Sequence, residues 1–294
     1  MTEPVLVDVC VCTFRRPSLA ATLASLKAQT LPADRFRIIV ADNDHETSAR
    51  ALVEEALEGR GGFLYLHAPA RNISVARNAC LEAATAGYVA WIDDDEVADR
   101  DWLDRLIAVL EAHDCDAVFG PVQAVYPGDA AAWAAAADLH STRPVQTPRG
   151  VDTGYTSNAL MKRAAVGERR FDPELGRSGG EDTDFFTGLY ASGARFAAAP
   201  DAIVREAVGP ERLGLSWLLK RAFRSGQTHA RRYLKPGAKR AVQAGIALAK
   251  SGACVGLAAL NVASASEGRR ALVRGALHLG AFARLAGVRE GRLY

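Results

Sequence analysis

Residues 88–96 read Tyr-Val-Ala-Trp-Ile-Asp-Asp-Asp-Glu, an apolar run that ends in four consecutive acidic side chains. A short continuous apolar run of this kind predicts a buried β-strand. Two earlier runs also end in polar clusters: Val5–Cys12 is followed by Thr13-Phe14-Arg15-Arg16, and Phe36–Ala41 is followed by Asp42-Asn43-Asp44. The fold prediction depends on what lies between these three segments.

Strand and helix patterns alternate through the first 120 residues. Further strands are expected at Phe63–His67 and Asp116–Val122, and helices after Pro17, around 52–57, over Ser74–Ala86 and over Trp102–His113. Strict alternation predicts parallel strands joined by right-handed crossovers, which is a doubly wound, mostly parallel α/β sheet. Ligands of such sheets bind beyond the carboxyl ends of the strands, so the three polar clusters are expected to meet at one edge.

The pattern changes after Pro127. An Ala-rich helix is expected over 130–139, a strand over Ser157–Met161 and a helix over Glu181–Ala191, and three helical segments without strand signals follow from residue 215. We therefore predict two parts: an α/β domain over residues 1–211 and a helical extension over residues 212–294.

The net charge of +2 hides a strong asymmetry along the chain. Residues 212–294 hold 16 Lys/Arg and 2 acids, a balance of +14, which leaves −12 on residues 1–211. The basic segment predicts an anionic partner, which is a membrane lipid, a nucleic acid or a phosphorylated substrate. Nucleic acid is disfavoured because the segment lacks interleaved aromatic residues and the acidic part would repel phosphates.

Composition excludes several classes of protein. An apolar content of 49% and a charged content of 24% rule out a disordered chain, a collagen-like repeat and a small disulfide scaffold. The five cysteines form no CxxC pair, which predicts reduced thiols in a reducing compartment. Cys10 and Cys12 are two residues apart in a strand pattern, so they are expected to share one face.

The sequence predicts a cytoplasmic protein that contacts a membrane surface. The first residues lack a basic leader, and 241–263, the segment closest to a membrane span, is interrupted by Gln243 and Lys250. The last helical segment has one apolar stripe, which runs from Leu272 to Ala286, and one basic stripe with Arg270 and Arg274. This pattern is typical both of a helix at a lipid interface and of a helix packed on the rest of the protein.

The acidic cluster after Ile92 is a candidate metal site. In extended geometry Asp93 and Asp95 would share a face, where two carboxylates repel one another unless a cation or hydroxyl groups neutralise them. Hard oxygen ligands suit Mg²⁺ or Mn²⁺. A solvated acidic turn before the helix that begins near Asp101 would give the same pattern.

A second candidate lies at 179–184, which reads Gly-Gly-Glu-Asp-Thr-Asp. The glycines allow the backbone to approach a ligand closely, and the acids stand where a helix favours negative charge, at its first turn. One interpretation is a general base that takes a proton from an attacking hydroxyl group. The other is a well-capped helix.

Taken together, these segments resemble a known family. VCTFRRP, IVADND, RNISVARN, WIDDDE and GGEDTDFF match glycosyltransferase family 2, with its GT-A fold, in order and in spacing over roughly residues 5–210. The chain is similar to the bacterial members that build exopolysaccharide, the glucosyltransferases of succinoglycan synthesis among them. The resemblance implies transfer of a sugar from a nucleotide-diphosphate donor.

The resemblance implies a role for each matching residue at the donor site. Thr13 and Arg15 lie where the family's first loop holds the nucleotide, and Arg71 lies near a stretch that contacts it. Asp42 matches the acid that binds a uracil base, and Asp93 matches the acid that binds the ribose. UDP is therefore the nucleotide that the resemblance implies.

The resemblance also implies the chemistry. Asp95 matches the metal ligand of the D-x-D motif, so Mg²⁺ or Mn²⁺ is the implied cofactor. Asp182 matches the catalytic base, with Glu181 beside it as an orienting or acceptor-binding acid. These roles imply one displacement, with inversion at the anomeric carbon, onto a saccharide hydroxyl of a lipid-linked acceptor.

The chain departs from the family pattern at two places. The second-strand motif continues as Asp44-His45-Glu46 where a Gly-Ser turn is usual, which weakens the assignment of the base. The stretch Gln227–Tyr233 does not fit the box of processive members, which favours transfer of a single sugar.

Other functions and residues stay open. A sugar nucleotidyltransferase shares this architecture but needs a Gly-rich loop, and Cys12–Pro17 contains no glycine. A non-catalytic protein that binds anionic surfaces through 212–294 is a further alternative, as is a scaffold that has lost its activity. His229 is a candidate third metal ligand or an ordinary helix residue. The basic segment 212–294 also carries four arginines suited to a lipid diphosphate: Arg221, Arg224, Arg231 and Arg232.

Overall fold

The computed structural model describes residues 5–128, 130–144, 146–148, 150–231 and 238–288. The chain forms two compact units, and each is described by itself. Unit 1 contains residues up to 123 and 142–206, and unit 2 contains 124–141 and 207–293. The segment 124–141 therefore belongs with the C-terminal helices, and the boundary at 211 stays a prediction from charge. Arg232 and Tyr233 lie outside the described residues.

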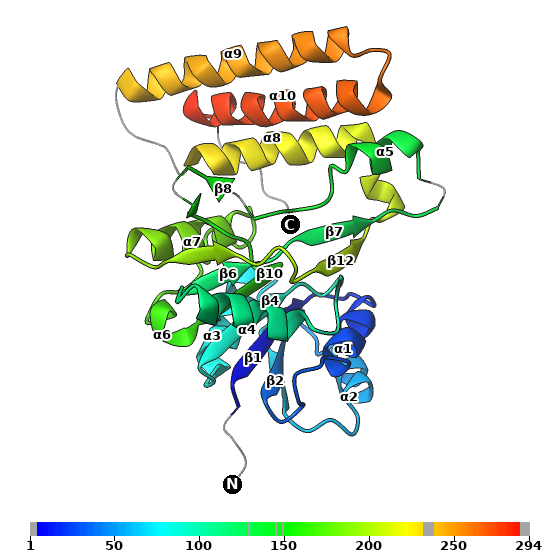
Figure 1. Ribbon diagram of the computed structural model, residues 1–294, viewed down its shortest axis with the longest axis vertical. Helices are drawn as coiled ribbons and strands as arrows, with labels where there is room; N and C mark the ends of the chain where they lie inside the picture. Colours follow the sequence, from blue (N-terminus) through cyan, green and yellow to red (C-terminus); the bar gives the residue numbers. More distant parts are fainter. Residues whose placement is uncertain (1–4, 129, 145, 149, 232–237, 289–294) are drawn as a thin grey trace. The chain divides into compact units, whose positions relative to one another are not determined.

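The centre of unit 1 is a seven-stranded sheet with the order β11-β6-β10-β4-β1-β2-β3 (Figure 1). Its strands are β1 (Val7–Thr13), β2 (Phe36–Asp42), β3 (Phe63–His67), β4 (Tyr88–Ile92), β6 (Ala117–Phe119), β10 (Asn158–Lys162) and β11 (Phe196–Ala198). The helices of this unit are α1 (Leu19–Lys27), α2 (Arg50–Ala56), α3 (Ile73–Ala83), α4 (Trp102–Ala112), α6 (Arg163–Val166) and α7 (Glu181–Ala191). The predicted α/β alternation is confirmed, as is the helix over Glu181–Ala191.

Small sheets complete the strand inventory. A three-stranded sheet has the order β5 (Glu96–Ala98), β12 (Val204–Ala207) and β7 (Val122–Val125), and β8 (Gln146–Thr147) pairs with β9 (Gly150–Val151). The predicted strand over Asp116–Val122 is thus two strands, β6 and β7, in two different sheets.

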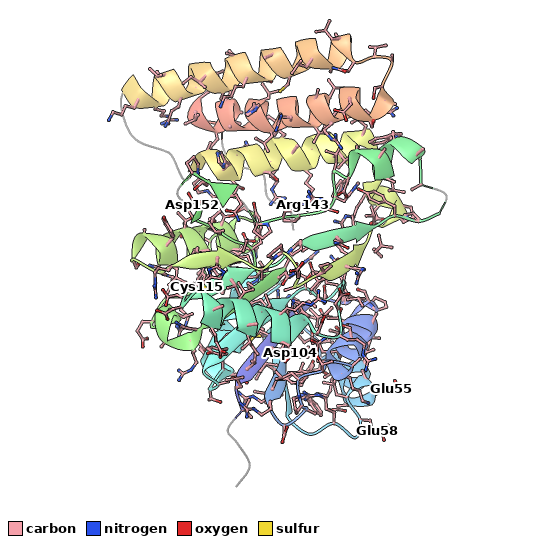
Figure 2. All side chains as sticks on the ribbon, in the orientation of Figure 1. Glu55, Glu58, Asp104, Cys115, Arg143 and Asp152 are labelled. Carbon is pink, nitrogen blue, oxygen red and sulfur yellow. The ribbon has the colours of Figure 1, made fainter. Side chains whose placement is uncertain are left out.

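The large sheet carries an apolar core on each face. One core gathers α1 and α4 residues such as Leu23 and Trp102 against β1 and β2, and the other packs Phe171 and Phe186 against α3 and β4. Because both faces are covered, the central strands are apolar on both sides, which explains their continuous apolar runs. Cys115, which Figure 2 labels, is buried between α4 and β6.

The prediction that Cys10 and Cys12 share one face of a strand is confirmed. All five thiols are free. Cys10 and Cys12 share one face of β1, where the thiols of both meet that of Cys80 on α3. Burial raises the pKa of Cys10.

One strand runs against the direction that alternation alone would give. β10 pairs antiparallel with both β4 and β6, while the other neighbouring pairs of the large sheet are parallel. Its sequence comes from beyond the alternating region, and it inserts between two strands that would otherwise be neighbours. The mostly parallel sheet is confirmed, with this one exception.

The geometry expected for the acidic cluster is wrong. β4 ends at Ile92, so Asp93–Asp95 form a turn before β5 and do not continue the strand. The alternation of faces that would place Asp93 and Asp95 together therefore does not apply. The turn is closed by Glu96, whose Oε2 accepts a hydrogen bond from the backbone N–H of Asp93 at 2.8 Å.

Unit 2 is helical, as predicted. Its elements are α5 (Ala132–Ala137), a 3-10 turn over Pro210–Arg212, α8 (Leu215–Arg231), α9 (Ala238–Leu260) and α10 (Ala265–Leu285). α10 packs against both α8 and α9 and lies between them (Figure 1). Arg270 also ties α10 to α5, because its guanidinium donates to the carbonyl oxygen of Ala137 at 2.9 Å.

Among the described residues, one helix is long and apolar enough to cross a membrane by length and composition: α9, over Lys239–Leu260, with 22% of its most apolar window buried. The expectation that 241–263 falls short of a span is not met on those two criteria. For α10 the sequence left two alternatives open, a helix at a lipid interface and a packed helix, and the structure has a helix packed against both α8 and α9.

Glycines set the crossing of α8 and α10. A Cβ atom on Gly226 would overlap the carbonyl oxygen of Leu277, and one on Gly280 would overlap the carbonyl oxygen of Phe223. The two backbones therefore touch directly at reciprocal positions. Because a neighbouring backbone cannot move aside as a flexible side chain does, the crossing requires glycine at both places.

We expect Gly280→Ala to lower the free energy of unfolding by about 1–3 kcal/mol through overpacking. The matched control is Gly256→Ala on α9, where a Cβ would meet nothing within 4 Å. There alanine is expected to stabilise by about 0.5–1 kcal/mol because it restricts the unfolded chain. Urea unfolding of both variants measures the difference, and equal effects would show that the crossing tolerates a methyl group.

Candidate active site

The first polar cluster and the acidic turn meet at the carboxyl edge of the sheet. Thr13, the last residue of β1, lies in register with Asp42, the last residue of β2. The Oγ1 of Thr13 donates a hydrogen bond to Oδ2 of Asp94 at 2.7 Å, and both side chains are buried. The predicted convergence of the three clusters is therefore present.

A second contact joins the same two segments. The guanidinium of Arg16 donates to Oδ2 of Asp95 at 2.6 Å and lies 3.6 Å from Oδ1 of Asp94. Arg16 is about half exposed, so it neutralises part of the acidic turn from the solvent side. Its role was not predicted from the sequence.

Two carboxyl groups of this turn have raised pKa values. Although 45% of the Asp93 side chain is open to solvent, desolvation by the surrounding protein raises the pKa of Asp93 to about 7, and Asp95 and Asp94 add to this effect. Burial raises the pKa of Asp94 to about 6. The turn has more carboxylate groups than nearby cationic side chains to neutralise them. Such an excess of negative charge favours binding of a cation.

The donor set suits a hard divalent cation but is incomplete. The turn supplies only carboxylate oxygens, the ligands that Mg²⁺ and Mn²⁺ prefer. Among the described residues, no group of three or more His, Cys, Asp or Glu side chains is arranged to hold a metal ion. The turn therefore fits an ion that takes its remaining ligands from a bound substrate.

Asp42 organises the loop that follows β2. It is fully buried, and its Oδ2 accepts hydrogen bonds from the hydroxyl of Tyr65 at 2.7 Å and the N–H of Ala49 at 2.8 Å. Its Oδ1 accepts from the N–H of Asp44 at 3.0 Å. Both oxygens are therefore engaged, so any contact with a base shares an oxygen that already has a partner.

Asp44 is the neighbouring acid that faces an arginine of the first loop. The Nε of Arg15 donates to Oδ2 of Asp44 at 2.7 Å. This hydrogen bond lowers the pKa of Asp44 to about 2. The residue that departs from the family pattern thus fixes the position of a predicted nucleotide-binding residue.

Arg15 and Arg71 flank one aromatic ring. Each guanidinium carbon lies 5.5 Å from the centroid of the Phe14 ring. Both residues are exposed, and both have positive φ, 55° for Arg15 and 45° for Arg71, which is uncommon for residues other than glycine. The backbone thus holds two cationic side chains at this edge in strained conformations, and such strain is often found at binding sites.

Arg77 links the acidic turn to the second candidate. It lies on α3 and is 6% exposed, and its Nη1 donates to Oε1 of Glu181, the first residue of α7. Its Nη2 lies 3.9 Å from Oδ1 of Asp93. Although burial opposes the charged form, the carboxylates of Glu181, Asp93 and Asp182 raise the pKa of Arg77. Arg77 is therefore a permanent cation at the centre of the site.

The glycines before α7 have left-handed backbone conformations, which glycine adopts without strain. Gly179 and Gly180 have φ values of 82° and 86°, and Gly180 is the N-cap residue. This turn leads the chain into the helix with Glu181 buried and Asp182 partly exposed. Glu181 Oε2 is buried and has no hydrogen-bond partner in the described part of the chain.

Asp182 has the environment of a base. Desolvation raises its pKa to about 6, Glu181 adds to the shift, and Arg77 opposes it. Its Oδ1 accepts a hydrogen bond from the N–H of Thr183 at 2.6 Å. A carboxylate with a raised pKa accepts a proton more readily than an ordinary aspartate does.

Sequence reasoning missed Arg77, although a signal was present. The buried residues of α3 include Ser74, Arg77, Cys80 and Leu81, which recur at helical spacing. A charged residue within the buried stripe of a helix requires a buried partner, which would have pointed to a second site element. His229, the candidate third metal ligand, lies on α8 in unit 2.

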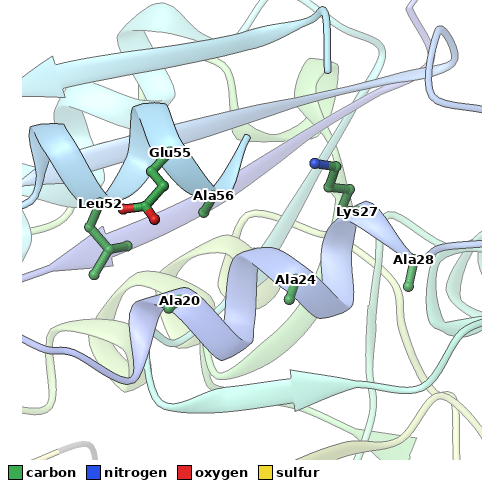
Figure 3. Close-up of a pocket in the computed structure, with 7 residues that line it drawn as sticks. All are labelled: Ala20, Ala24, Lys27, Ala28, Leu52, Glu55 and Ala56. Carbon is green, nitrogen blue, oxygen red and sulfur yellow. The ribbon is translucent and has the colours of Figure 1, made fainter. Parts of the chain in front are cut away.

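A separate groove lies between α1 and α2, with a volume of about 630 Å³ (Figure 3). Ala20 and Ala24 line it from α1, Ala28 from the residue after α1, and Leu52, Glu55 and Ala56 from α2. None of the residues discussed above lines this groove. It owes its width to the small side chains on α1.

Comparison with known proteins agrees with this geometry. Residues 8–170 match the family model described as glycosyl transferase family 2. The chain belongs to this family. It is 46% identical over 298 residues to the succinoglycan biosynthesis protein ExoM of Rhizobium meliloti, covering 99% of this chain and 96% of that protein. A shorter match, 32% identical over 120 residues, is to the glucosyl-dolichyl phosphate glucuronosyltransferase of Haloferax volcanii, covering 40% of this chain and 38% of that protein.

Solved structures of similar fold include a mannosyltransferase and a protein in complex with a nucleotide sugar. The mannosyltransferase PcManGT of Pyrobaculum calidifontis, in complex with GDP-Man and Mn²⁺, has a TM-score of 0.68 at 18% identity, over 98% of this chain and 89% of that one. S. aureus TarS 1–349 in complex with UDP-GlcNAc has a TM-score of 0.56 at 15% identity, over 92% and 90%. The chain spans 55% of the longer TarS chain. These likenesses confirm the predicted fold class.

The Arg77–Glu181 pair gives a prediction on stability. Arg77→Met leaves the Glu181 carboxylate buried and unpaired, so we expect a loss of about 3–5 kcal/mol in the free energy of unfolding. Arg77→Met combined with Glu181→Gln removes both charges and is expected to recover a large part of this loss. Arg50→Met, at an exposed pair with Glu54, is the control and should cost no more than about 1 kcal/mol. Additive losses in the double variant would contradict the pairing.

Proposed function

We propose that this family 2 glycosyltransferase moves one sugar from a UDP-hexose to a hydroxyl group of a saccharide acceptor, with inversion at the anomeric carbon. The observation that carries the proposal is the connection of three segments at one edge of the sheet. Thr13 contacts the acidic turn, and Arg77 contacts both that turn and Glu181. A donor site and a base are thereby held within one network.

The donor site follows from the residues at the carboxyl edge. We assign the nucleotide to Thr13, Arg15, Asp42, Arg71 and Asp93. The cations of Arg15 and Arg71 beside Phe14 suit an anionic diphosphate or a stacked base. The complex of TarS with UDP-GlcNAc supports a uridine nucleotide.

We assign Mg²⁺ or Mn²⁺ to the acidic turn, with Asp95 as the ligand. The complex of PcManGT with GDP-Man and Mn²⁺ supports this choice. A bound divalent ion would supply positive charge that stabilises the departing diphosphate. Arg16, which now pairs with Asp95, would exchange this partner for the phosphates of the donor.

The chemical step belongs to Asp182. Its carboxylate takes the proton of the acceptor hydroxyl as that oxygen forms the new bond to the anomeric carbon. The bond between that carbon and the diphosphate oxygen breaks on the opposite face, so the nucleoside diphosphate leaves with the electron pair. Glu181, held by Arg77, orients the acceptor, and Asp182 later returns its proton to solvent.

The biological setting is inferred from the relatives. High identity to ExoM over the whole chain supports a role in exopolysaccharide synthesis. The Haloferax volcanii relative is named for a sugar joined to dolichyl phosphate, and this name supports a lipid-linked acceptor. We therefore place the reaction in the cytoplasm, at the inner face of the membrane, with the basic segment 212–294 toward anionic lipid.

Asp182→Asn is expected to lower the rate of sugar transfer by at least ~10²-fold, a typical contribution of a general base, because the amide cannot accept the proton. UDP binding should remain. The control is Asp184→Asn, an exposed acid on the same first turn of α7, which is expected to keep nearly normal activity. Steady-state kinetics and calorimetric titration with UDP measure the two properties.

The pH profile provides a second readout of the same residue. The base works in its ionised form, and its pKa is about 6, so the wild-type rate should fall as the pH drops below that value. Asp182→Asn should lose this acid limb. Normal turnover in Asp182→Asn, or an unchanged limb, would refute the assignment.

The metal assignment predicts that UDP binds more tightly with Mn²⁺ than with EDTA. Asp95→Asn should reduce this difference by at least ~10-fold, because one carboxylate ligand is lost. Asp101→Asn, at a partly exposed acid paired with Arg105, is the control and should bind as the wild type does. Equal affinity with Mn²⁺ and EDTA in the wild type would refute a metal at the donor site.

A further inference from the structure

α9 turns a continuous apolar face to solvent. Between residues 241 and 260, fourteen residues are exposed, and Lys250 is the only one of them with a polar side chain. Val242, Ile246 and Leu257 are each at least half exposed, and Leu260 is 83% exposed. These positions lie on one side of the helix and extend over about 30 Å of its length.

The opposite side of α9 packs within unit 2. Ala247, Ser251, Cys254 and Ala258 are buried at helical spacing. The Oγ of Ser251 donates a hydrogen bond to the carbonyl oxygen of Gly275 on α10 at 3.0 Å. α9 is therefore fixed to α10 through one side, and the apolar face is the side left over.

This arrangement inverts the usual pattern of a surface helix. A helix at the surface of a water-soluble domain carries polar residues on its outer side. On α9 the buried side consists of small side chains, and the side that faces solvent carries the larger apolar side chains. Exposed apolar surface on this scale marks a site of interaction.

Positive charge borders the face. Lys239 and Lys250 are exposed on α9, and Arg274 is exposed on the adjacent α10. Burial lowers the pKa of His278, and Lys250 and Arg274 lower it further, which indicates a positive potential where the two helices meet. Over 238–288 the chain has seven Lys/Arg and one acid. The surroundings of the face therefore complement an anionic surface.

The composition of the face favours lipid over a protein partner. Centres of protein interfaces are enriched in aromatic residues, Met and Arg, which fill pockets of the partner, and are depleted in Ala. The exposed residues of 241–260 are Ala, Gly, Val, Leu and Ile together with one Lys. Such a surface offers apolar area to acyl chains, but it lacks the large side chains that fill pockets in a protein partner.

We propose that the exposed face of α9 is a membrane-docking surface that lies in the plane of an anionic bilayer. Its apolar side chains enter the boundary between headgroups and acyl chains, and Lys239 and Lys250 contact the headgroups. The proposal deepens the membrane contact given above and rests on that proposed function. The charge pattern alone pointed to the whole basic segment 212–294 as the membrane contact. The proposal assigns this contact to α9 and to the burial of its apolar side chains.

The experiment is flotation of the full-length protein with vesicles of phosphatidylcholine, with and without phosphatidylglycerol. The wild type should bind the anionic vesicles and retain part of this binding at high salt, because apolar burial is not screened. Ile246→Gln combined with Leu257→Gln should weaken binding by at least ~10-fold through lost apolar burial. Lys250→Gln should weaken binding by about fivefold, and only at low salt.

The matched control is Val5→Gln combined with Val125→Gln, two exposed apolar residues outside α9, which should bind as the wild type does. Circular dichroism and UDP titration check that each variant folds. Because UDP binding and transfer to a soluble acceptor are measured without vesicles, failure of docking and failure of the proposed reaction are distinguishable.

Three results would overturn the proposal. The wild type could fail to float with either vesicle. The α9 variants could lose self-association in sedimentation while their vesicle binding is unchanged, which would assign the face to a second copy of this chain. Binding that persists after dilution and cannot be reversed would instead indicate that α9 spans the bilayer.

Discussion

The candidate active site depends on one buried cation. Arg77 is held inside unit 1 by Glu181, a residue 104 positions further along the chain, and lies close to Asp93 after β4. A buried charge without a partner is far more costly than a paired one. Three segments that are distant in sequence, the middle of α3, the turn after β4 and the start of α7, are therefore required to meet. The sheet provides the edge on which they meet, and the ion pair selects the arrangement.

The same cation sets the charge balance of the site. Arg77 faces the carboxylates of Glu181, Asp93 and Asp182, which together raise its pKa. It stabilises Glu181 most directly and leaves the acidic turn and Asp182 with raised pKa values. In the mechanism that we propose, this excess of carboxylate lets Asp182 take a proton and lets the acidic turn bind a cation. In the proposed mechanism these are separate tasks of one network.

Local patterns predicted the parts of the fold that depend on local physics. The strands of unit 1 were readable because burial on both faces makes them continuously apolar. The helix α7 was readable because its acidic first turn follows two glycines. The antiparallel insertion of β10 was not readable, since strand pairing is decided by tertiary contacts. The turn at Asp93–Asp95 was misjudged because a strand's last residue depends on where its neighbour ends. Arg77 was missed because its role depends on Glu181, a partner far along the chain that the sequence around Arg77 does not indicate.

The helices of unit 2 show how packing can override an amphipathic pattern. The stripe from Leu272 to Ala286 predicts a contact face on α10, but the residues of α10 that are most buried include Gly268, Gly275 and Gly280. Glycines allow the backbones of α8 and α10 to touch, so the two helices make contact at positions that have no side chain. Because α10 uses this approach on one side and meets α9 on the other, α9 becomes an outer helix whose exposed face is its most apolar one. Water alone does not stabilise that exposure. A lipid surface does, because acyl chains take the apolar side chains out of water and anionic headgroups attract the lysines that border them.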